Sequence, residues 1–167
     1  VSSCTFDITV NALPDPDCPE DMDLCCDDDP VVLGPAVDKG TVSDTTYSGT
    51  GVSTSVGNYV FTPDCNNIDD FTITKTVYDN ETDCENSCDF IISVHALPEV
   101  TCPADLNVCS DDAPFALTDG TPSGGTHSGT GVTAGEFDPS DAGVGTWEIT
   151  YEVTDDVYGC VTSCTYD

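Results

Sequence analysis

The sequence has almost no positive charge. It contains two lysines, Lys39 and Lys75, and no arginine, against 32 Asp and Glu residues, so its formal net charge is −30. Binding to a phosphate backbone depends on Lys and Arg contacts, and this balance therefore excludes nucleic acid as a partner. No apolar run approaches the length of about 18 residues that marks a membrane span, so we expect no direct insertion into a membrane.

Helical periodicity and catalytic motifs are also missing. No segment carries a sustained helical period. His95 and His127 do not belong to a Ser/His/Asp arrangement. The acidic pairs at 69–70 and 155–156 lie beside expected strands or turns without an evident cleft, unlike the two carboxylates of a glycosidase. We predict that the chain is not an enzyme.

What the sequence does contain is an internal repeat. Residues 5–14 return as residues 89–98, which is an offset of 84, and toward the C-terminus the offset shortens to 76, where Phe71 aligns with Trp147. Residues 1–7 also overlay residues 161–167. Such self-similarity marks an array of like units. The predicted domains are the last strand of a preceding repeat (1–12), repeat one (13–96), and repeat two without most of its last strand (97–167).

The repeated segments alternate apolar and polar residues, as Phe6, Ile8 and Val10 do. Period two with one apolar face is typical of a half-buried strand. Strands are expected at about 69–79 and 88–96, joined by a loop at 80–87, and again at 147–153. The SerGlyThrGly motifs at 48–51 and 128–131 indicate tight turns between strands. We predict an all-β fold of tandem immunoglobulin-like β-sandwich repeats.

Eleven cysteines in 167 residues indicate a disulfide framework outside the cell. When the repeats are aligned, Ser110 and Asp141 of repeat two stand at the positions of Cys26 and Cys65. The two cysteines were therefore gained or lost together and are predicted to pair. No Cys-x2-Cys spacing or His partner supports a zinc cluster.

The other pairs follow if the first and last strands of each sandwich run parallel and side by side. Their starts are then adjacent, which pairs the first cysteine of each repeat with its last, and elimination gives the remaining pairs. Cys4 is the odd cysteine, and its partner is expected in an upstream repeat. The predicted pairs are Cys18–Cys88, Cys102–Cys164, Cys25–Cys84 and Cys109–Cys160.

An acidic cluster follows the first AlaLeuPro sequence at 12–14. Eight carboxylates fall within residues 15–29. Ca²⁺ takes about six to eight oxygen ligands, often from carboxylates, so a calcium ion is a candidate cofactor, although no spacing matches an EF-hand loop. An ordinary solvated acidic surface explains the same composition. The candidate ligands are Asp15, Asp17, Glu20, Asp21 and Asp23.

Residues 120–155 (GTPSGGTHSGTGVTAGEFDPSDAGVGTWEITYEVTD), followed by GlyCys at 159–160, resemble the immunoglobulin-like, PKD-like tandem repeats of giant surface proteins in Bacteroidota. The resemblance implies export by the type IX pathway and a stalk or adhesive fibre. It also implies O-glycosylation at Thr45, in the sequence AspThrThr at 44–46. Asn80 fits the N-glycosylation pattern in an expected surface loop. Repeat one departs from the family pattern between Pro35 and Asp70.

We expect a structural repeat segment of a long extracellular adhesin or surface filament, a stiff stalk or fibre in adhesion or gliding. Its partners would be neighbouring repeats, other copies of the fibre, and surfaces or glycans.

Two alternatives stay open. One is a polysaccharide-binding module attached to a secreted enzyme, whose mark would be exposed aromatics among Tyr47, Tyr59, Tyr78 and Tyr158. The other is a subunit that polymerises by lending residues 1–12 to the incomplete second repeat of its neighbour. Cys4 and Cys164 would then compete for one partner.

Overall fold

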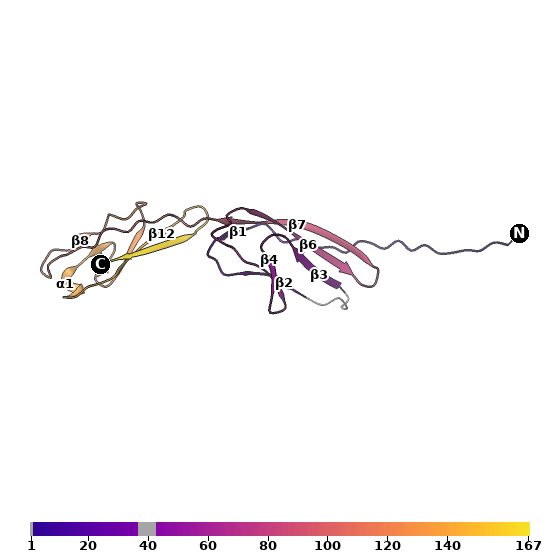
Figure 1. Cartoon of the computed structure of the whole chain (residues 1–167), viewed down its shortest axis with the longest axis horizontal. Helices are drawn as coiled ribbons and strands as arrows, with labels where there is room; N and C mark the ends of the chain where they lie inside the picture. Colours follow the sequence, from indigo (N-terminus) through magenta and orange to yellow (C-terminus); the bar gives the residue numbers. More distant parts are fainter. Residues whose placement is uncertain (1, 37–42) are drawn as a thin grey trace. The chain divides into compact units, whose positions relative to one another are not determined.

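The computed structural model describes residues 2–36 and 43–167 (Figure 1). Lys39 and part of the region between Pro35 and Asp70 lie outside the described residues. The chain divides into two compact units, Val1–Val94 and His95–Asp167, whereas the sequence places this division after residue 96. Among the described residues, the regular elements of both units are strands apart from one short helix, which confirms the all-β class. No described helix is long and apolar enough to cross a membrane.

Unit 1 consists of two sheets. One has the order β1-β7-β6-β3 and the other the order β2-β5-β4. The rings of Phe61 on β5 and Phe71 on β6 lie 5.3 Å apart, so the two sheets are in contact. The strands are β1 (Met22–Cys25), β2 (Val31–Pro35), β3 (Ser43–Ser48), β4 (Val52–Ser55), β5 (Asn58–Phe61), β6 (Asp70–Asp79) and β7 (Cys84–His95).

The hairpin of β6 and β7 carries the core of unit 1, and the two strands lie side by side in Figure 1. Ile73 pairs with Phe90 and Phe71 pairs with Ile92, and all four side chains are buried. The ladder continues to Asp79 and Cys84, so the turn is residues 80–83. The predicted loop at 80–87 is therefore too long, because backbone pairing extends the strand through polar residues that show no apolar alternation.

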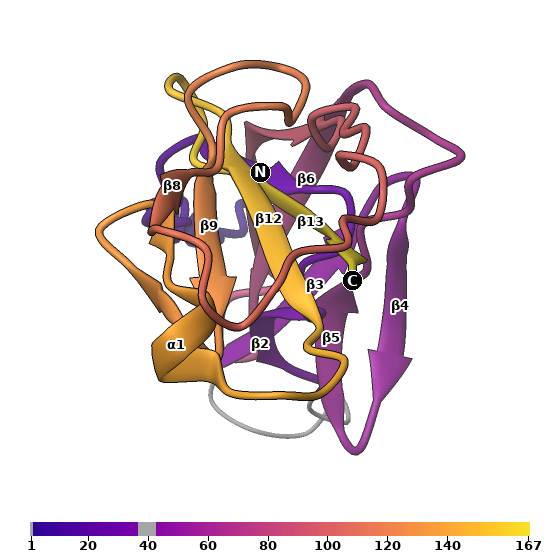
Figure 2. The same ribbon diagram turned by 90° about the vertical axis from the view of Figure 1, so that its left-hand side faces the viewer.

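Unit 2 has the same kind of build with shorter strands. Its sheets have the orders β13-β12-β9 and β10-β11-β8, and β9, β12 and β13 lie side by side in Figure 2. Its buried cluster is Ile149, Tyr151, Val153 and Tyr166. The elements are β8 (Phe115–Ala116), β9 (Thr126–Gly129), β10 (Val132–Thr133), β11 (Glu136–Phe137), α1 (Pro139–Ala142), β12 (Ile149–Thr154) and β13 (Val161–Tyr166).

The one-turn helix α1 forms on local signals. The side chain of Asp138 accepts hydrogen bonds from the backbone N–H groups of Ser140 and Asp141, Pro139 occupies the first turn, and Gly143 caps the C-terminus. Asp138 pairs with backbone N–H groups that the start of a helix leaves without partners, and Pro139 has no N–H group to leave unpaired. A single turn is too short to produce the apolar period by which helices are recognised in a sequence.

The SerGlyThrGly motifs connect β3 to β4 and β9 to β10, and both are turns as predicted. Gly51 and Gly131 have φ angles of 86° and 81°, in the left-handed region that glycine adopts without strain. A Cβ atom at Gly51 would lie 2.5 Å from Cε2 of Phe61. The motif therefore combines a backbone requirement with a steric one.

Residues 2–12, which were predicted as the last strand of a preceding repeat, form no strand in the structure, and that assignment stays a prediction. Residues 2–21 contain neither helix nor strand, and the side chains of residues 2–13 are exposed. A strand is defined by backbone hydrogen bonds to a neighbouring strand, and none of the described segments pairs with this one. The alternating pattern is present there without the partner that it requires.

Candidate functional site

Three predicted disulfides are present in the structure: Cys18–Cys88, Cys26–Cys65 and Cys102–Cys164. Their Cα–Cα distances are 5.9, 4.6 and 5.8 Å, within the usual range of about 4.4 to 6.8 Å. Bridges of this kind are typical of secreted or extracellular proteins.

The predicted pairs Cys25–Cys84 and Cys109–Cys160 are wrong. Cys84 and Cys109 are free thiols, whereas Cys25 and Cys160 are disulfide-bonded. Cys4 is also free and exposed, and its upstream partner stays a prediction.

The reason is the strand direction. Residue 18 bridges residue 88, and Asp21 Oδ1 accepts a hydrogen bond of 2.7 Å from Ile91 N, so both connections span 70 positions. The two segments therefore run parallel. The same offset brings Cys25 level with residue 95, which is 11 residues along β7 from Cys84, or roughly 35 Å. Nested pairs such as 18–88 and 25–84 require antiparallel segments.

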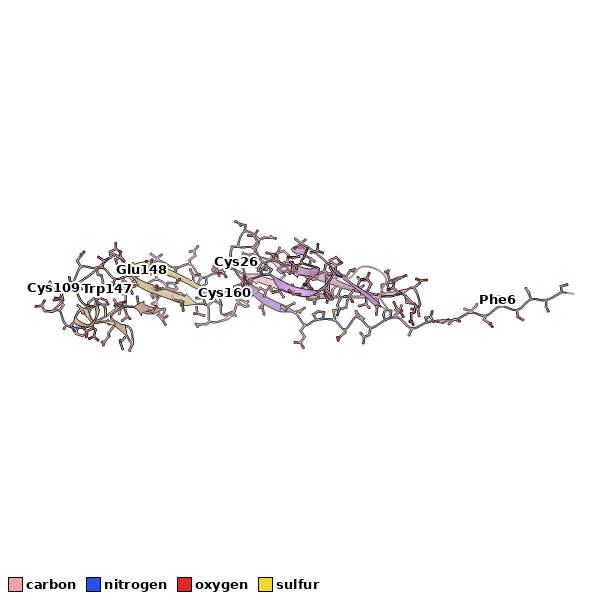
Figure 3. The ribbon with its side chains drawn as sticks, turned by 90° about the horizontal axis from the view of Figure 1, so that it is seen from below. Phe6, Cys26, Cys109, Trp147, Glu148 and Cys160 are labelled. Atoms are coloured by element: carbon pink, nitrogen blue, oxygen red, sulfur yellow. A yellow bond between two sulfur atoms is a disulfide. The ribbon has the colours of Figure 1, made fainter. Side chains whose placement is uncertain are left out.

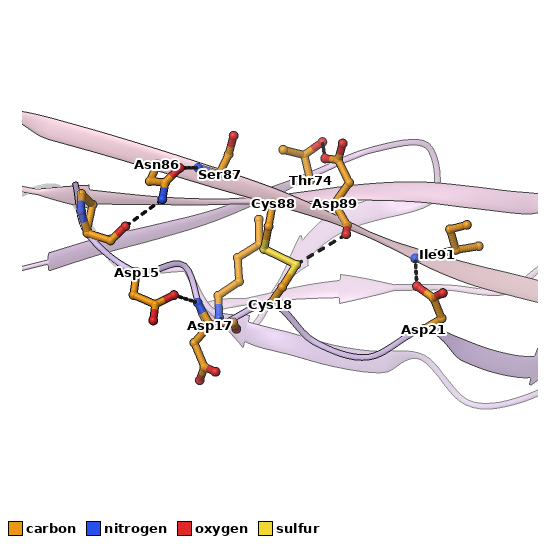
Figure 4. The surroundings of a disulfide bond; sticks show 12 residues. Asp15, Asp17, Cys18, Asp21, Thr74, Asn86, Ser87, Cys88, Asp89 and Ile91 are labelled. Carbon is orange, nitrogen blue, oxygen red and sulfur yellow. Dashed lines mark hydrogen bonds between the residues drawn. A yellow bond between two sulfur atoms is a disulfide. The ribbon is translucent and has the colours of Figure 1, made fainter. Parts of the chain in front are cut away.

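The bridge lies within a set of contacts that hold residues 14–21, here called the junction segment, against the hairpin of β6 and β7 (Figure 4). Asn86 Nδ2 donates to Pro14 O at 3.0 Å, at the start of the segment. Lys75 Nζ donates to Asp17 O at 2.8 Å. With the Cys18 bridge and the Asp21 hydrogen bond, the segment is fixed at four points along its length.

The sequence reasoning missed Lys75 and Asn86. Lys75 lies on β6 in the same alternation as Phe71 and Ile73, so its position marks it as a charged side chain on the otherwise apolar face. The sequence offered one further indication, because Lys75 is one of only two lysines among 32 acidic residues. In the structure it contacts a backbone carbonyl of the acidic segment.

Unit 2 repeats part of this arrangement. Cys102 bridges Cys164, and Asp105 Oδ1 accepts a hydrogen bond of 3.1 Å from Asp167 N. Both connections span 62 positions. Leu106 N then donates to Asp167 O at 2.7 Å. In both units, the first segment and the last strand are thus held parallel by a disulfide and by an aspartate. The aspartate lies three residues after the cysteine of the first segment.

The five candidate calcium ligands do not converge. All are exposed, and no three His, Cys, Asp or Glu side chains among the described residues could hold one metal ion. Asp15 and Asp21 have structural partners instead, since Asp15 Oδ1 accepts from Asp17 N at 3.0 Å and Asp21 Oδ1 accepts from Ile91 N. The calcium site stays a prediction.

The candidate glycosylation sites lie in different settings. Asn80 lies in the turn between β6 and β7, as expected for a surface loop. Thr45 lies within β3, paired with Val77 and half-buried, which is less open than a loop. Both modifications stay predictions.

The aromatics proposed as a polysaccharide platform are partly used inside unit 1. Tyr47 is buried, and its ring lies 5.7 Å from that of Tyr59, so its predicted exposure is wrong. Tyr78 donates from its hydroxyl to Asp83 Oδ1 at 2.5 Å. Tyr158 is half exposed, and its ring stacks on that of His95.

His127 is the most informative titratable group of unit 2. Its Nδ1 lies 3.0 Å from the hydroxyl of Tyr166, and its ring lies 4.6 Å from that of Tyr151. Burial among these rings lowers the pKa of His127 below its ordinary value of 6.5, because burial disfavours the charged imidazolium. The folded unit therefore favours the neutral form of the His127 imidazole.

We expect the stability of unit 2 to fall as the pH falls below 6.5. The unfolded chain then binds a proton at His127 that the folded unit resists, so protonation favours unfolding, and the stability is fully present only above the unfolded pKa. Urea unfolding at about pH 7.5 and about pH 5.5, followed by the fluorescence of Trp147, measures this. His127→Gln should lose less stability between the two pH values than the wild type. An equal loss in both proteins would contradict the assignment.

Comparisons with known proteins give little. No protein-family model matches the chain, and no curated protein matches it. Among solved structures, the endo-fucoidan hydrolase MfFcnA4 of glycoside hydrolase family 107 is 14% identical over 89% of this chain and 27% of its own, with a TM-score of 0.32. A variant of that enzyme gives 16% identity, the same coverages and a TM-score of 0.35. This chain thus spans about a quarter of those proteins, and the likeness is too low to carry an argument about fold or activity.

Proposed function

We propose that the chain is a structural repeat segment of an extracellular, cell-surface adhesin or filament, built of immunoglobulin-like β-sandwich units that carry load along a stalk. The observation that carries this proposal is the position of the disulfides. In each unit the bridge joins the first segment of the unit to its last strand, Cys18 to Cys88 and Cys102 to Cys164.

This position matters because of the path that tension takes through tandem units. A pulling force enters unit 1 at the junction segment and leaves along the end of β7. The covalent link from Cys18 to Cys88 lies between these two points, so it gives the force a path that bypasses the fold between the two cysteines. Unit 2 is shielded in the same way by Cys102–Cys164. A stalk built of such units keeps its length when a fold opens.

The surface fits a scaffold in water better than a recognition site. With 32 acidic and two basic residues, copies of the chain repel one another and stay soluble. Neighbouring repeats of the same array are the natural partners. Attachment to surfaces or glycans would then belong to the array as a whole, and immunogold labelling along surface filaments of the producing cells would test that placement.

Single-molecule force spectroscopy tests the shielding directly. With the chain held between two handles under oxidising conditions, unit 1 should release little length on unfolding. After reduction it should release roughly 250 Å, because a stretch of 70 positions extends by about 3.6 Å per residue. Unit 2 should release roughly 220 Å for its span of 62 positions.

The matched control is Cys26→Ser with Cys65→Ser. Both positions lie inside the loop that Cys18–Cys88 closes, so removing their bridge should add no released length under oxidising conditions. Steps of the full reduced length in the oxidised wild-type chain would contradict the proposed role.

A further inference from the structure

The first cysteine of unit 1 has two candidate partners on the last strand. Cys84 and Cys88 both lie on β7, and Cys18 is bonded to Cys88, whereas Cys84 is a free thiol. The two candidates are four positions apart, which is about 13 Å along an extended strand. Pairing Cys18 with Cys84 instead would require the junction segment to shift by four positions along β7.

The alternation of β7 does not exclude this shift. Cys84 and Cys88 lie on the same face of the strand as Phe90 and Ile92, which is the face toward the core. A shift by one residue would move every side chain to the opposite face, but a shift by four leaves each of them on its own face. The register must therefore be set by something other than the apolar pattern.

Asp21 distinguishes the two registers. In the observed register its Oδ1 accepts a hydrogen bond of 2.7 Å from Ile91 N, three residues after Cys88. After a shift by four positions, Asp21 would be level with Ser87. The backbone N–H group of Ser87 already donates to Oδ1 of Asn86 at 3.0 Å (Figure 4). The carboxylate would therefore lose a charge-assisted hydrogen bond without gaining another.

Asn86 supports the observed register with both ends of its amide. While its Oδ1 occupies the N–H group of Ser87, its Nδ2 donates to Pro14 O at 3.0 Å. The second bond holds the start of the junction segment, and a shift by four positions would break it as well. Because Asn86 lies between the two candidate cysteines in the sequence, its contacts bear directly on which of them is used.

Unit 2 presents the same two candidates and the same outcome. Cys160, labelled in Figure 3, lies four positions before Cys164, and Cys102 bonds to Cys164. Asp105 Oδ1 accepts a hydrogen bond from Asp167 N, again three residues after the bonded cysteine. The arrangement of cysteine, aspartate and backbone N–H group is thus repeated within the chain.

We propose that the aspartate of the sequence Cys-Pro-x-Asp, at 18–21 and 102–105, is a positioning residue that selects the disulfide partner of the cysteine before it. In unit 1 it directs Cys18 to Cys88 by accepting an N–H group further along β7, and Asn86 disfavours the shifted register. This role is separate from load bearing, because it concerns how the bridge forms and not what the bridge carries.

The selection acts through thiol–disulfide exchange with a glutathione couple. When the bond forms, two thiols lose two protons and two electrons, and one glutathione disulfide accepts them to give two glutathione thiols. When the pair of Cys18 with Cys84 converts, the thiolate of Cys88 attacks Cys18 Sγ and the thiolate of Cys84 leaves, without net oxidation. The two pairs therefore equilibrate, and their ratio measures the selection.

The test refolds the reduced 167-residue chain, carrying Cys4→Ser, in a glutathione buffer and then traps the remaining thiols with iodoacetamide. Cleavage after glutamate gives the fragments 1–20, 82–85 and 86–99, each with a single cysteine. Mass spectrometry of the unreduced digest measures how much of fragment 1–20 is joined to each of the other two. The ratio is read on every chain in which Cys18 is bonded, whether or not a variant reaches the native fold.

Asp21→Ala should lower the ratio of the Cys88 pair to the Cys84 pair by about tenfold, because the lost hydrogen bond has a charged acceptor. Asp21→Asn keeps an acceptor oxygen and should restore most of the ratio. Asp21→Ala combined with Asn86→Ala should lower it further than Asp21→Ala alone. Asp17→Asn removes a charge from the junction segment but keeps the backbone carbonyl, and it should leave the ratio unchanged.

Gly57→Ala separates selection from stability. It strains the turn between β4 and β5, where φ is 76°, and so weakens unit 1 equally in both registers. The ratio should therefore stay as in the wild type. An equal fall in Gly57→Ala and Asp21→Ala would overturn the proposal, because the ratio would follow stability alone. A ratio that Asp21→Ala leaves unchanged, or a fall that Asp21→Asn does not reverse, would overturn it as well.

Discussion

Replacing Cys102 and Cys164 together by serine is expected to lower the free energy of unfolding of unit 2 by about 4 kcal/mol. The bridge closes a loop of 62 positions, and without it the unfolded chain gains the freedom that this closure removes. A unit of about 70 residues buries only a little more than half of its unfolded surface, so it has little stability to lose. We expect the double variant to be largely unfolded at ordinary temperature.

Trp147 reports this transition because it lies in unit 2 and no other tryptophan is present. Urea unfolding followed by its fluorescence should show the loss. Cys4→Ser is the matched control, since Cys4 is free and exposed and its replacement should leave the midpoint unchanged. A loss in the double variant below about 1 kcal/mol would show that the bridge does not hold unit 2 together.

Gly51→Ala is expected to destabilise unit 1 by about 3 kcal/mol. Its φ of 86° is strained for any residue with a Cβ. The added atom would also lie 2.5 Å from the ring of Phe61, which is 1% exposed and cannot move without disturbing the contact between the sheets. Strain and overpacking therefore add at this position.

Gly57→Ala separates the two costs. Gly57 has a φ of 76°, but a Cβ there meets no atom within 4 Å, so this variant carries the backbone strain alone and should cost about 1 kcal/mol. Thermal unfolding followed by circular dichroism compares the variants, and the transition reported by Trp147 should stay in place in both. Equal losses in the two variants would rule out the contact with Phe61 as a cause.

The alternating pattern predicted the strands well where a buried face exists. Phe71 and Ile73 on β6, and Phe90 and Ile92 on β7, lie inward as their spacing indicates. At residues 5–12 the same pattern has an apolar face but no neighbouring strand among the described segments, so their assignment to a preceding repeat stays a prediction. Periodicity reports what a segment can bury, and only a partner turns it into a strand.

The cysteines show a similar limit. Cys26 and Cys65 could be paired by comparing the repeats, because the two positions changed together. Cys25 and Cys109 could not, because their pairing depends on the register between the first segment and the last strand. The aspartates Asp21 and Asp105 fix that register, and their role as acceptors for backbone N–H groups is visible only in the structure.

The sequence by itself determined the all-β class, the repeat, the turns of the SerGlyThrGly motifs and the acidic, cysteine-rich character of the chain. These depend on local spacing and composition, which each residue carries with it. Only the tertiary structure decided the cysteine register and the anchoring of the junction segment by Lys75 and Asn86. Each of these depends on which segments far apart in the chain lie side by side, and no local pattern encodes that placement.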